Sequence, residues 1–195
     1  MALPIWISTS SPDHDTAANW SPATAPANGD SVTFDNVGTA NCTTNMTQAG
    51  ETYAAVSVSP NYAGQIGTSG SPYAPAAITI LNWKGAGQAF IASVVASIYV
   101  DSPNANPAAL TLTSTGITLM DIVRGGVTIS GTGTTAASGR INVGGSGNLT
   151  LNGAAMGAST EIIVNDQGVL WIYVNIINLT MNGGEVWLGT KTTTG

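Results

Sequence analysis

The chain has 195 residues, only 7% of them charged, and its ten acidic and four basic side chains give a formal net charge of −6. Four scattered cations cannot displace counterions from a nucleic-acid backbone or hold an anionic membrane surface, so both partners are excluded. A hydrophobic content of 43% also excludes a disordered chain.

Residues 1–50 form an irregular opening that contains several prolines. Its start, MALPIWISTSSPDHD, lacks a basic segment and has only a short apolar patch, unlike a secretory signal peptide. Later apolar stretches are shorter than the about 20 residues of a membrane-spanning helix, so we expect no membrane insertion. We predict that residues 1–50 are a cap or docking segment, in which Trp6 and Trp20 contact other subunits or a capsid.

Two carboxylates, Asp30 and Asp35, flank the first alternating run of apolar residues in NGDSVTFD. Paired carboxylates about 5 to 9.5 Å apart can hydrolyse a glycosidic bond. Aspartate is also common at turns, where it accepts backbone N–H bonds, and we favour this interpretation here. His14 lies between two acids, an arrangement more typical of a solvated loop than of a weak cation site or a catalytic base.

From residue 51 onward we predict a domain of short β-strands. Apolar residues alternate with polar or β-branched ones in brief runs separated by Gly, Asn, Pro and Ser, a pattern typical of strands with one buried face. Together with the first run, they occupy residues 32–34, 56–58, 78–80, 97–100, 110–112, 117–119, 127–129, 141–143, 149–151, 162–164, 169–174, 179–181 and 186–188.

These runs recur at intervals near 20 residues, for example from 56 to 78 and from 127 to 149. Such an interval matches one coil of a parallel β-solenoid, in which coils stack about 4.8 Å apart. Gly- and Asn-rich segments between runs tolerate the positive φ of tight corners. We therefore predict an all-β, right-handed parallel β-helix at residues 51–195. A β-sandwich or jelly roll, which also uses short strands and frequent turns, is the alternative.

The last predicted coils carry two tryptophans, Trp171 and Trp187. A solenoid must cover its ends, because a terminal coil exposes apolar side chains and unpaired strand edges. We predict that Trp171 and Trp187 make contacts between subunits.

Charged residues in the solenoid are few, at about one per coil. Arg140 and Glu161 are about one coil apart, so we expect them to be neighbours in a surface ladder. Neither a metal-ligand cluster nor a phosphate-binding loop is recognisable, and we predict no catalytic residues, metal or cofactor.

The segment WSPATAPANGDSVTF at 20–34, followed by AAVSVSPNYAGQIGTSGSPYAPAAITI at 54–80, resembles the opening of a group of β-helix proteins. That group shares an NW…P..GD.V.F pattern and a Y.G.IG turn into the next coil. It includes autotransporter-type passengers and small structural proteins of tailed bacteriophages. The phage branch fits better because this chain is short and has no secretion signal. Enzymatic tailspikes, by contrast, are several hundred residues long and have acid-lined grooves.

The resemblance implies a non-enzymatic virion structural protein of the capsid decoration, cement or head-spike type. It would be made in the host cytoplasm and assemble as a rigid homotrimer on the capsid surface, with the major capsid protein as its partner. The alternative is a carbohydrate-binding or depolymerising adhesin similar to a tailspike. Its host-surface glycan would stack on the exposed aromatics Tyr53, Tyr62, Tyr73 and Tyr99. A fragment of an autotransporter adhesin, which would need an export signal upstream, is a third hypothesis.

Overall fold

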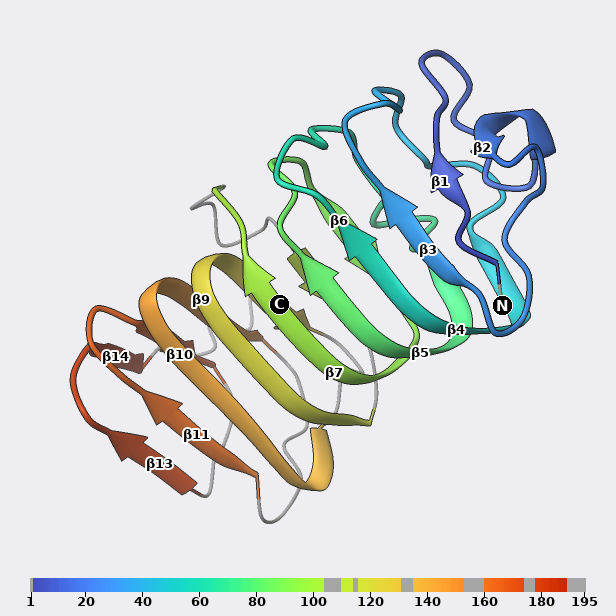
Figure 1. Cartoon of the computed structure of the whole chain (residues 1–195). Helices are drawn as coiled ribbons and strands as arrows, with labels where there is room; N and C mark the ends of the chain where they lie inside the picture. Colours follow the sequence, from blue (N-terminus) through green and yellow to red (C-terminus); the bar gives the residue numbers. More distant parts are fainter. Residues whose placement is uncertain are drawn as a thin grey trace, which may run out of the picture.

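The computed structural model describes residues 2–103, 110–113, 116–130, 135–152, 160–173 and 178–188, with the side chains of 135–138, 178 and 188 left out. Its strands are stacked in parallel coils of about six turns, which confirms the predicted β-solenoid. The near strands in Figure 1 run upward while the coils advance from right to left, so the helix is right-handed. Among the described strands only β1 and β2 pair in an antiparallel manner, which rules out the β-sandwich.

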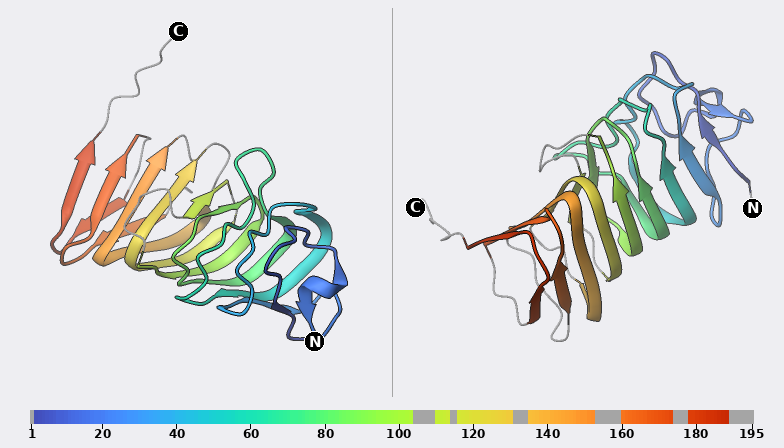
Figure 2. Two further views of the ribbon diagram at one scale, coloured as in Figure 1. Left: turned by 90° about the horizontal axis from the view of Figure 1, so that it is seen from above. Right: turned by 60° about the vertical axis from the view of Figure 1, so that its left-hand side comes forward.

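Three columns of strands form the sides of the solenoid (Figure 2). The first column is the near face in Figure 1. It contains β1 (Ile5–Trp6), β3 (Ser31–Phe34), the later parts of β4 (Thr47–Val58), β5 (Ala74–Trp83) and β7 (Val94–Asp101), parts of β9 (Ile117–Ser130) and β10 (Thr135–Asn152), β11 (Glu161–Val164) and β13 (Asn178–Met181).

The other two columns use the remaining parts of the same coils. Strands β4, β5, β7, β9 and β10 are long because they bend around a corner, and their first residues make the second column. The third column contains β6 (Ala89–Ile91), β8 (Leu110–Leu112), the last parts of β9 and β10, β12 (Val169–Ile172) and β14 (Glu185–Leu188).

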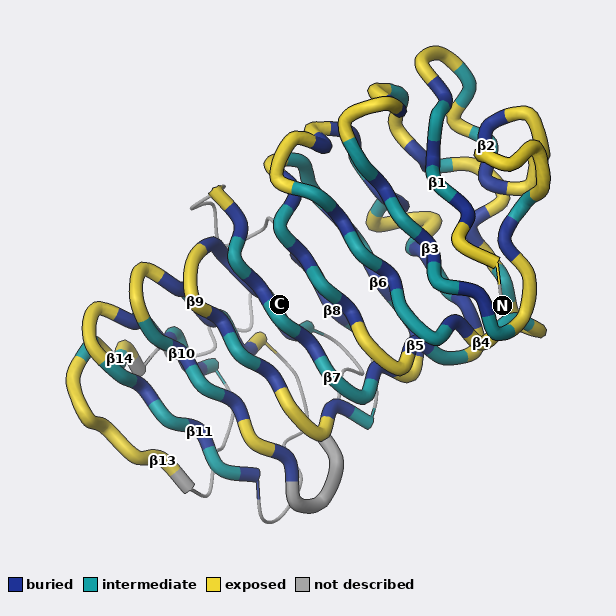
Figure 3. The backbone as a smooth tube through the Cα atoms, in the orientation of Figure 1, coloured by how far each residue is buried: buried dark blue, intermediate teal, exposed yellow. Residues whose placement is uncertain are grey.

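The core follows from the alternation of apolar residues, since successive side chains of a strand point to opposite faces. Figure 3 shows this as buried and partly exposed positions that alternate along the near strands. In the first column one inward position repeats from coil to coil and is buried in every coil from β3 to β11: Val32, Val56, Leu81, Ile98, Met120, Ile141 and Ile162. Burial of each such side chain contributes about 1.5–3 kcal/mol.

The spacing of the coils is less regular than the alternation. Register partners are 17 positions apart between Leu81 and Ile98, but 25 apart between Val56 and Leu81. The additional residues of the longer coils lie in corners and loops. The same positions of the strands therefore point inward in each coil, although the coils differ in length.

The N-terminal end is closed by a small cap. Strand β2 (Trp20–Ser21) follows the 3-10 turn Ala17–Asn19 and pairs with β1, the first strand of the column. The predicted boundary at residue 50 falls inside β4, and β1 and β3 on its N-terminal side already belong to the parallel column. In the described residues no helix has the length and apolar character to cross a membrane.

Candidate functional site

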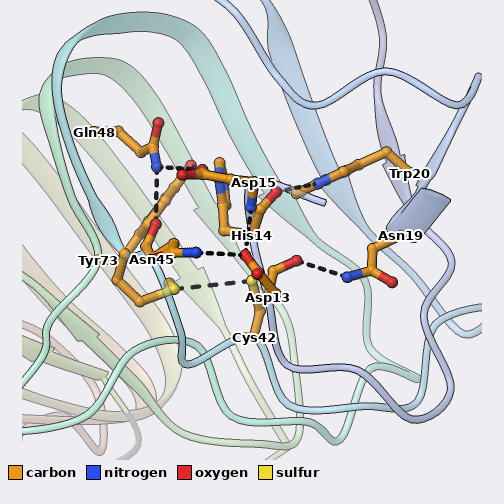
Figure 4. Close-up of polar contacts among 10 residues, drawn as sticks. Asp13, His14, Asp15, Asn19, Trp20, Cys42, Asn45, Gln48 and Tyr73 are labelled. Atoms are coloured by element: carbon orange, nitrogen blue, oxygen red, sulfur yellow. Dashed lines mark hydrogen bonds and ion pairs between the residues drawn. The ribbon is translucent and has the colours of Figure 1, made fainter. Parts of the chain in front are cut away.

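The cap is held by a cluster of polar and aromatic side chains around His14 (Figure 4). The carbonyl of His14 accepts a 2.7 Å hydrogen bond from Trp20 Nε1, and its ring nitrogens lie 3.2 Å from Asp15 Oδ1 and 3.4 Å from the Tyr73 hydroxyl. Neighbouring acids are held in turn, because Asn45 donates to Asp13 and Gln48 donates to Asp15. These contacts connect the irregular opening to the segments at residues 45–48 and 73.

His14 is fully buried, so its predicted place in a solvated loop was wrong. Its ring lies 5.2 Å from that of Trp20 and 5.4 Å from that of Tyr73. Burial lowers the pKa of His14, an effect that Asp15 partly opposes. No cluster of three metal-ligating side chains occurs within the described part of the chain.

Cys42 lies in the same region and is also buried. Its Sγ is 3.9 Å from Met46 Sδ, and burial raises the pKa of the thiol well above its ordinary value. A buried neutral thiol is a poor nucleophile, so Cys42 acts as a small apolar core residue.

Trp6 and Trp20 do not form a contact surface, and their prediction as contacts was wrong. Both are fully buried, and their ring centroids lie 5.1 Å apart in an edge-to-face arrangement. Each indole N–H is used internally: Trp6 Nε1 donates to the carbonyl of Ala40, and Trp20 Nε1 to that of His14. The two indoles are the core of the cap.

Asp30 and Asp35 organise turns. Asp30 is buried and accepts hydrogen bonds from the backbone N–H groups of Ala2, at 2.6 Å, and Ala27, at 3.0 Å. Asp35 accepts one from the backbone of Val37 at 2.8 Å. These bonds agree with the interpretation of both carboxylates as turn residues.

Within the described coils, two ion pairs join successive coils on the outside of the solenoid. Arg140 and Glu161 are register partners in β10 and β11, and their side chains are 3.0 Å apart, which confirms the predicted ladder. Arg124 pairs at 2.9 Å with Asp101 of the preceding coil. Both pairs are largely exposed and add little stability.

The aromatics expected to stack on a glycan are mostly inside. Tyr53, Tyr62 and Tyr73 are buried, so that part of the prediction was wrong. Tyr99 is partly exposed on the first column, and Lys84 Nζ lies 5.7 Å from the centroid of its ring.

Tyr99 belongs to a polar row on the outer face of the first column, which we call the outer row. The register aligns one outward position of successive coils, and from β3 to β10 its members are the polar residues Thr33, Ser57, Asn82, Tyr99, Asp121 and Asn142. In β11 and β13 the same position continues with Ile163 and Thr180, which we do not count in the outer row. Sequence reasoning missed this row, because it depends on which residues of successive coils are register partners.

Two hollows lie along the outer row and share Tyr99. The first hollow, of about 540 Å³, extends from Tyr99 toward the C-terminal coils; it is lined by Asp121, Ile122, Val123, Asn142, Gly144, Gly145, Asn165, Asp166 and Asn182. The second hollow, of about 530 Å³, extends toward the N-terminal coils and is lined by Thr33, Ser57, Val58, Ser59, Pro60, Asn82 and Lys84. The outer row and its hollows are the candidate binding site.

The C-terminal end differs from the closed N-terminal end. Among the described strands, β13 pairs only with β11 and β14 only with β12. Leu179 and Met181 have the buried Ile162 and Val164 as register partners, yet they are 38% and 50% exposed because no described strand follows them. We call this surface the open end.

Trp171 and Trp187 lie beside the open end on the outer face of the third column. Their rings are stacked with centroids 5.2 Å apart, and Trp187 is 49% exposed. Trp187 Nε1 donates to Glu185 at 3.1 Å. This exposed stack is compatible with the predicted subunit contact, which stays a prediction.

Comparison of the chain with protein-family models, with curated proteins and with solved structures finds no significant match in any of the three.

Proposed function

We propose that the chain is a non-enzymatic structural protein of a tailed-phage virion, a decoration or spike protein that stands on the capsid as a homotrimer. The observation that carries this proposal is the open end, where Leu179 and Met181 of the first column are exposed, together with the exposed Trp187 of the Trp171–Trp187 stack in the third column. Unpaired strand edges and exposed apolar side chains favour association. Contact with further copies of this chain would bury both the unpaired strand edges and the exposed apolar side chains.

A second apolar surface supports packing of the rods along their length. Ile80 and Leu119 lie in one outward line of the first column, separated by Ser97, and are 44% and 39% exposed. The low charge of the chain also supports close packing, because few like charges would repel between copies. On the capsid the proposed partner is the major capsid protein, as in the phage proteins that the chain resembles.

Native mass spectrometry of the purified chain tests the assembly, and we expect the mass of a trimer. The double variant Leu179→Glu, Met181→Glu places charges at the open end and should give monomers. Val37→Glu is the control, because Val37 is also an exposed apolar residue but lies near the cap. A wild-type chain that is monomeric, or a double variant that stays trimeric, would contradict the role of the open end.

Cross-linking of purified phage particles tests the location. We expect cross-links between this chain and the major capsid protein, found by mass spectrometry of the digested particles. Particles that lack the chain would rule out the virion role, whatever its mass in solution.

A further inference from the structure

The first hollow has the polar groups of a ligand site and is open to solvent. Asp121 and Asn142 face it from neighbouring coils, and the Asn142 amide donates to the Asp121 carboxylate. Asn182 donates to Asn165 at 3.0 Å on the same side. These bonds fix the positions of the four side chains without using all their hydrogen-bonding capacity, since each carboxylate or amide oxygen can accept a further bond.

Tyr99 gives the site an aromatic surface. It stands where the two hollows meet, with Lys84 on the side of the preceding coil and Asp121 as its register partner in the following one. A ring beside carboxylate and amide groups is the combination that recognises a sugar. The ring packs against the C–H face of a pyranose, while the polar groups bind its hydroxyls.

We propose that the first hollow, with Tyr99, binds an oligosaccharide that is uncharged or carries amino groups. Asp121 and Asp166 accept hydrogen bonds from sugar hydroxyls, and Asn142 and Asn165 accept or donate as the hydroxyls require. Tyr99 packs against one sugar ring on the side of the first hollow, away from Lys84. Neither role needs a catalytic step, and the inference does not rest on the proposed virion role.

Charge selects the class of glycan. The described lining of the first hollow has two carboxylates and no cation. The nearest basic residues do not line this hollow. Arg124 pairs with Asp101, and Lys84 lies over the Tyr99 ring on the side of the second hollow. A uronate or sialylated chain would therefore meet like charge, which disfavours binding.

The spacing of the coils suits an extended glycan. Outer-row residues repeat at the strand spacing of about 4.8 Å, which is close to the length of one pyranose unit in an extended chain. An oligosaccharide that lies along the row can therefore present one unit to each coil, from Tyr99 through Asp121 to Asn142. Several weak contacts of this kind add up along the chain.

Isothermal titration of the whole chain tests the proposal with three probes: neutral hexose oligosaccharides, amino-sugar oligosaccharides and oligouronates of equal length. We expect binding to at least one of the first two and none to the oligouronates. Tyr99→Ala and Asn142→Ala should each weaken that binding at least tenfold, while Tyr99→Phe should retain most of it because the ring remains.

The matched control is Asn152→Ala, which removes the same side chain from the same strand, β10, at an exposed position of the third column. Circular dichroism checks that each variant is folded. Binding of none of the probes, a preference for oligouronates, or equal losses in Asn142→Ala and Asn152→Ala would overturn the proposal. None of these results bears on the mass of the assembly or on its cross-links to a capsid, so the two proposals fail separately.

Discussion

Arg140 Nη2 lies 3.0 Å from Glu161 Oε2, and the two residues are register partners one coil apart. Their separation in the chain is therefore the length of that coil. Residues that are about one coil apart in the sequence are thus side by side on the surface of the solenoid.

The Arg140–Glu161 pair should contribute little to stability. Both side chains are more than a third exposed, so water and salt screen the attraction. A double-mutant cycle with Arg140→Ala and Glu161→Ala, followed by urea unfolding, should give a coupling energy of about 0–1 kcal/mol that falls with added salt. A larger coupling that does not change with salt would contradict this picture of a solvated pair.

The inward ladder should instead carry a large share of the stability. Ile141 is fully buried, and Ile141→Ala should lower the free energy of unfolding by about 2–5 kcal/mol. Ile80→Ala is the control, since Ile80 is in the same column but 44% exposed, and should cost at most about 1 kcal/mol. Urea unfolding of both variants measures the difference. If both variants lost the same free energy of unfolding, the assignment of Ile141 to the core and of Ile80 to the outer face would be wrong.

The repeating part of the fold could be predicted because it depends on local alternation. Runs such as those containing Ile141 and Ile162 place every second side chain inside, and stacking then aligns them as register partners. The pairing of Arg140 with Glu161 could be predicted from the same alternation of inward and outward residues, together with a coil length of about 20 residues. The varying coil lengths could not be predicted, because loops of different size can leave the same inward phase intact.

The cap could not be predicted in the same way. Residues 1–50 have no clear period, so nothing in the local pattern indicates that Trp6, Trp20 and His14 lie inside. Their burial depends on contacts with distant segments, such as that between His14 and Tyr73. The outer row around Tyr99 was missed for a related reason, since its members become neighbours only through the register of several coils.

Stability should depend on pH through His14. Burial lowers the folded-state pKa of His14 below the ordinary value of 6.5, whereas the unfolded chain keeps that value. Between the two pKa values the unfolded state holds more protons, so the contribution of His14 is complete above pH 6.5 and is lost as the pH falls toward the folded pKa. The slope cannot exceed about 1.4 kcal/mol per pH unit for one group.

The other ionisable groups around His14 do not produce the same decline in stability between pH 8 and 5. Hydrogen bonding from Asn45 lowers the pKa of Asp13 below 3.8, so the contribution of Asp13 is lost only at a lower pH. Burial raises the pKa of Tyr73 well above 10, and Asp15 partly offsets the shift of His14. Urea unfolding between pH 8 and 5 should show a decline in the wild type that is reduced in His14→Phe. An identical decline in both chains would assign the effect to other groups.

One corner between coils should require glycine at a single position. Gly145 has a φ of +52°, and a Cβ there would overlap the carbonyl oxygen of Val123 in the preceding coil. Gly145→Ala should therefore lower the free energy of unfolding by at least about 1–2 kcal/mol.

The adjacent Gly144→Ala is the control, because a Cβ at Gly144 would make only an ordinary contact with Asn165. That variant should be within about 1 kcal/mol of the wild type, since alanine also restricts the unfolded chain. Thermal and urea unfolding of the two variants compare them directly, and a corner that tolerates both substitutions equally would show that the coils can shift apart at this point.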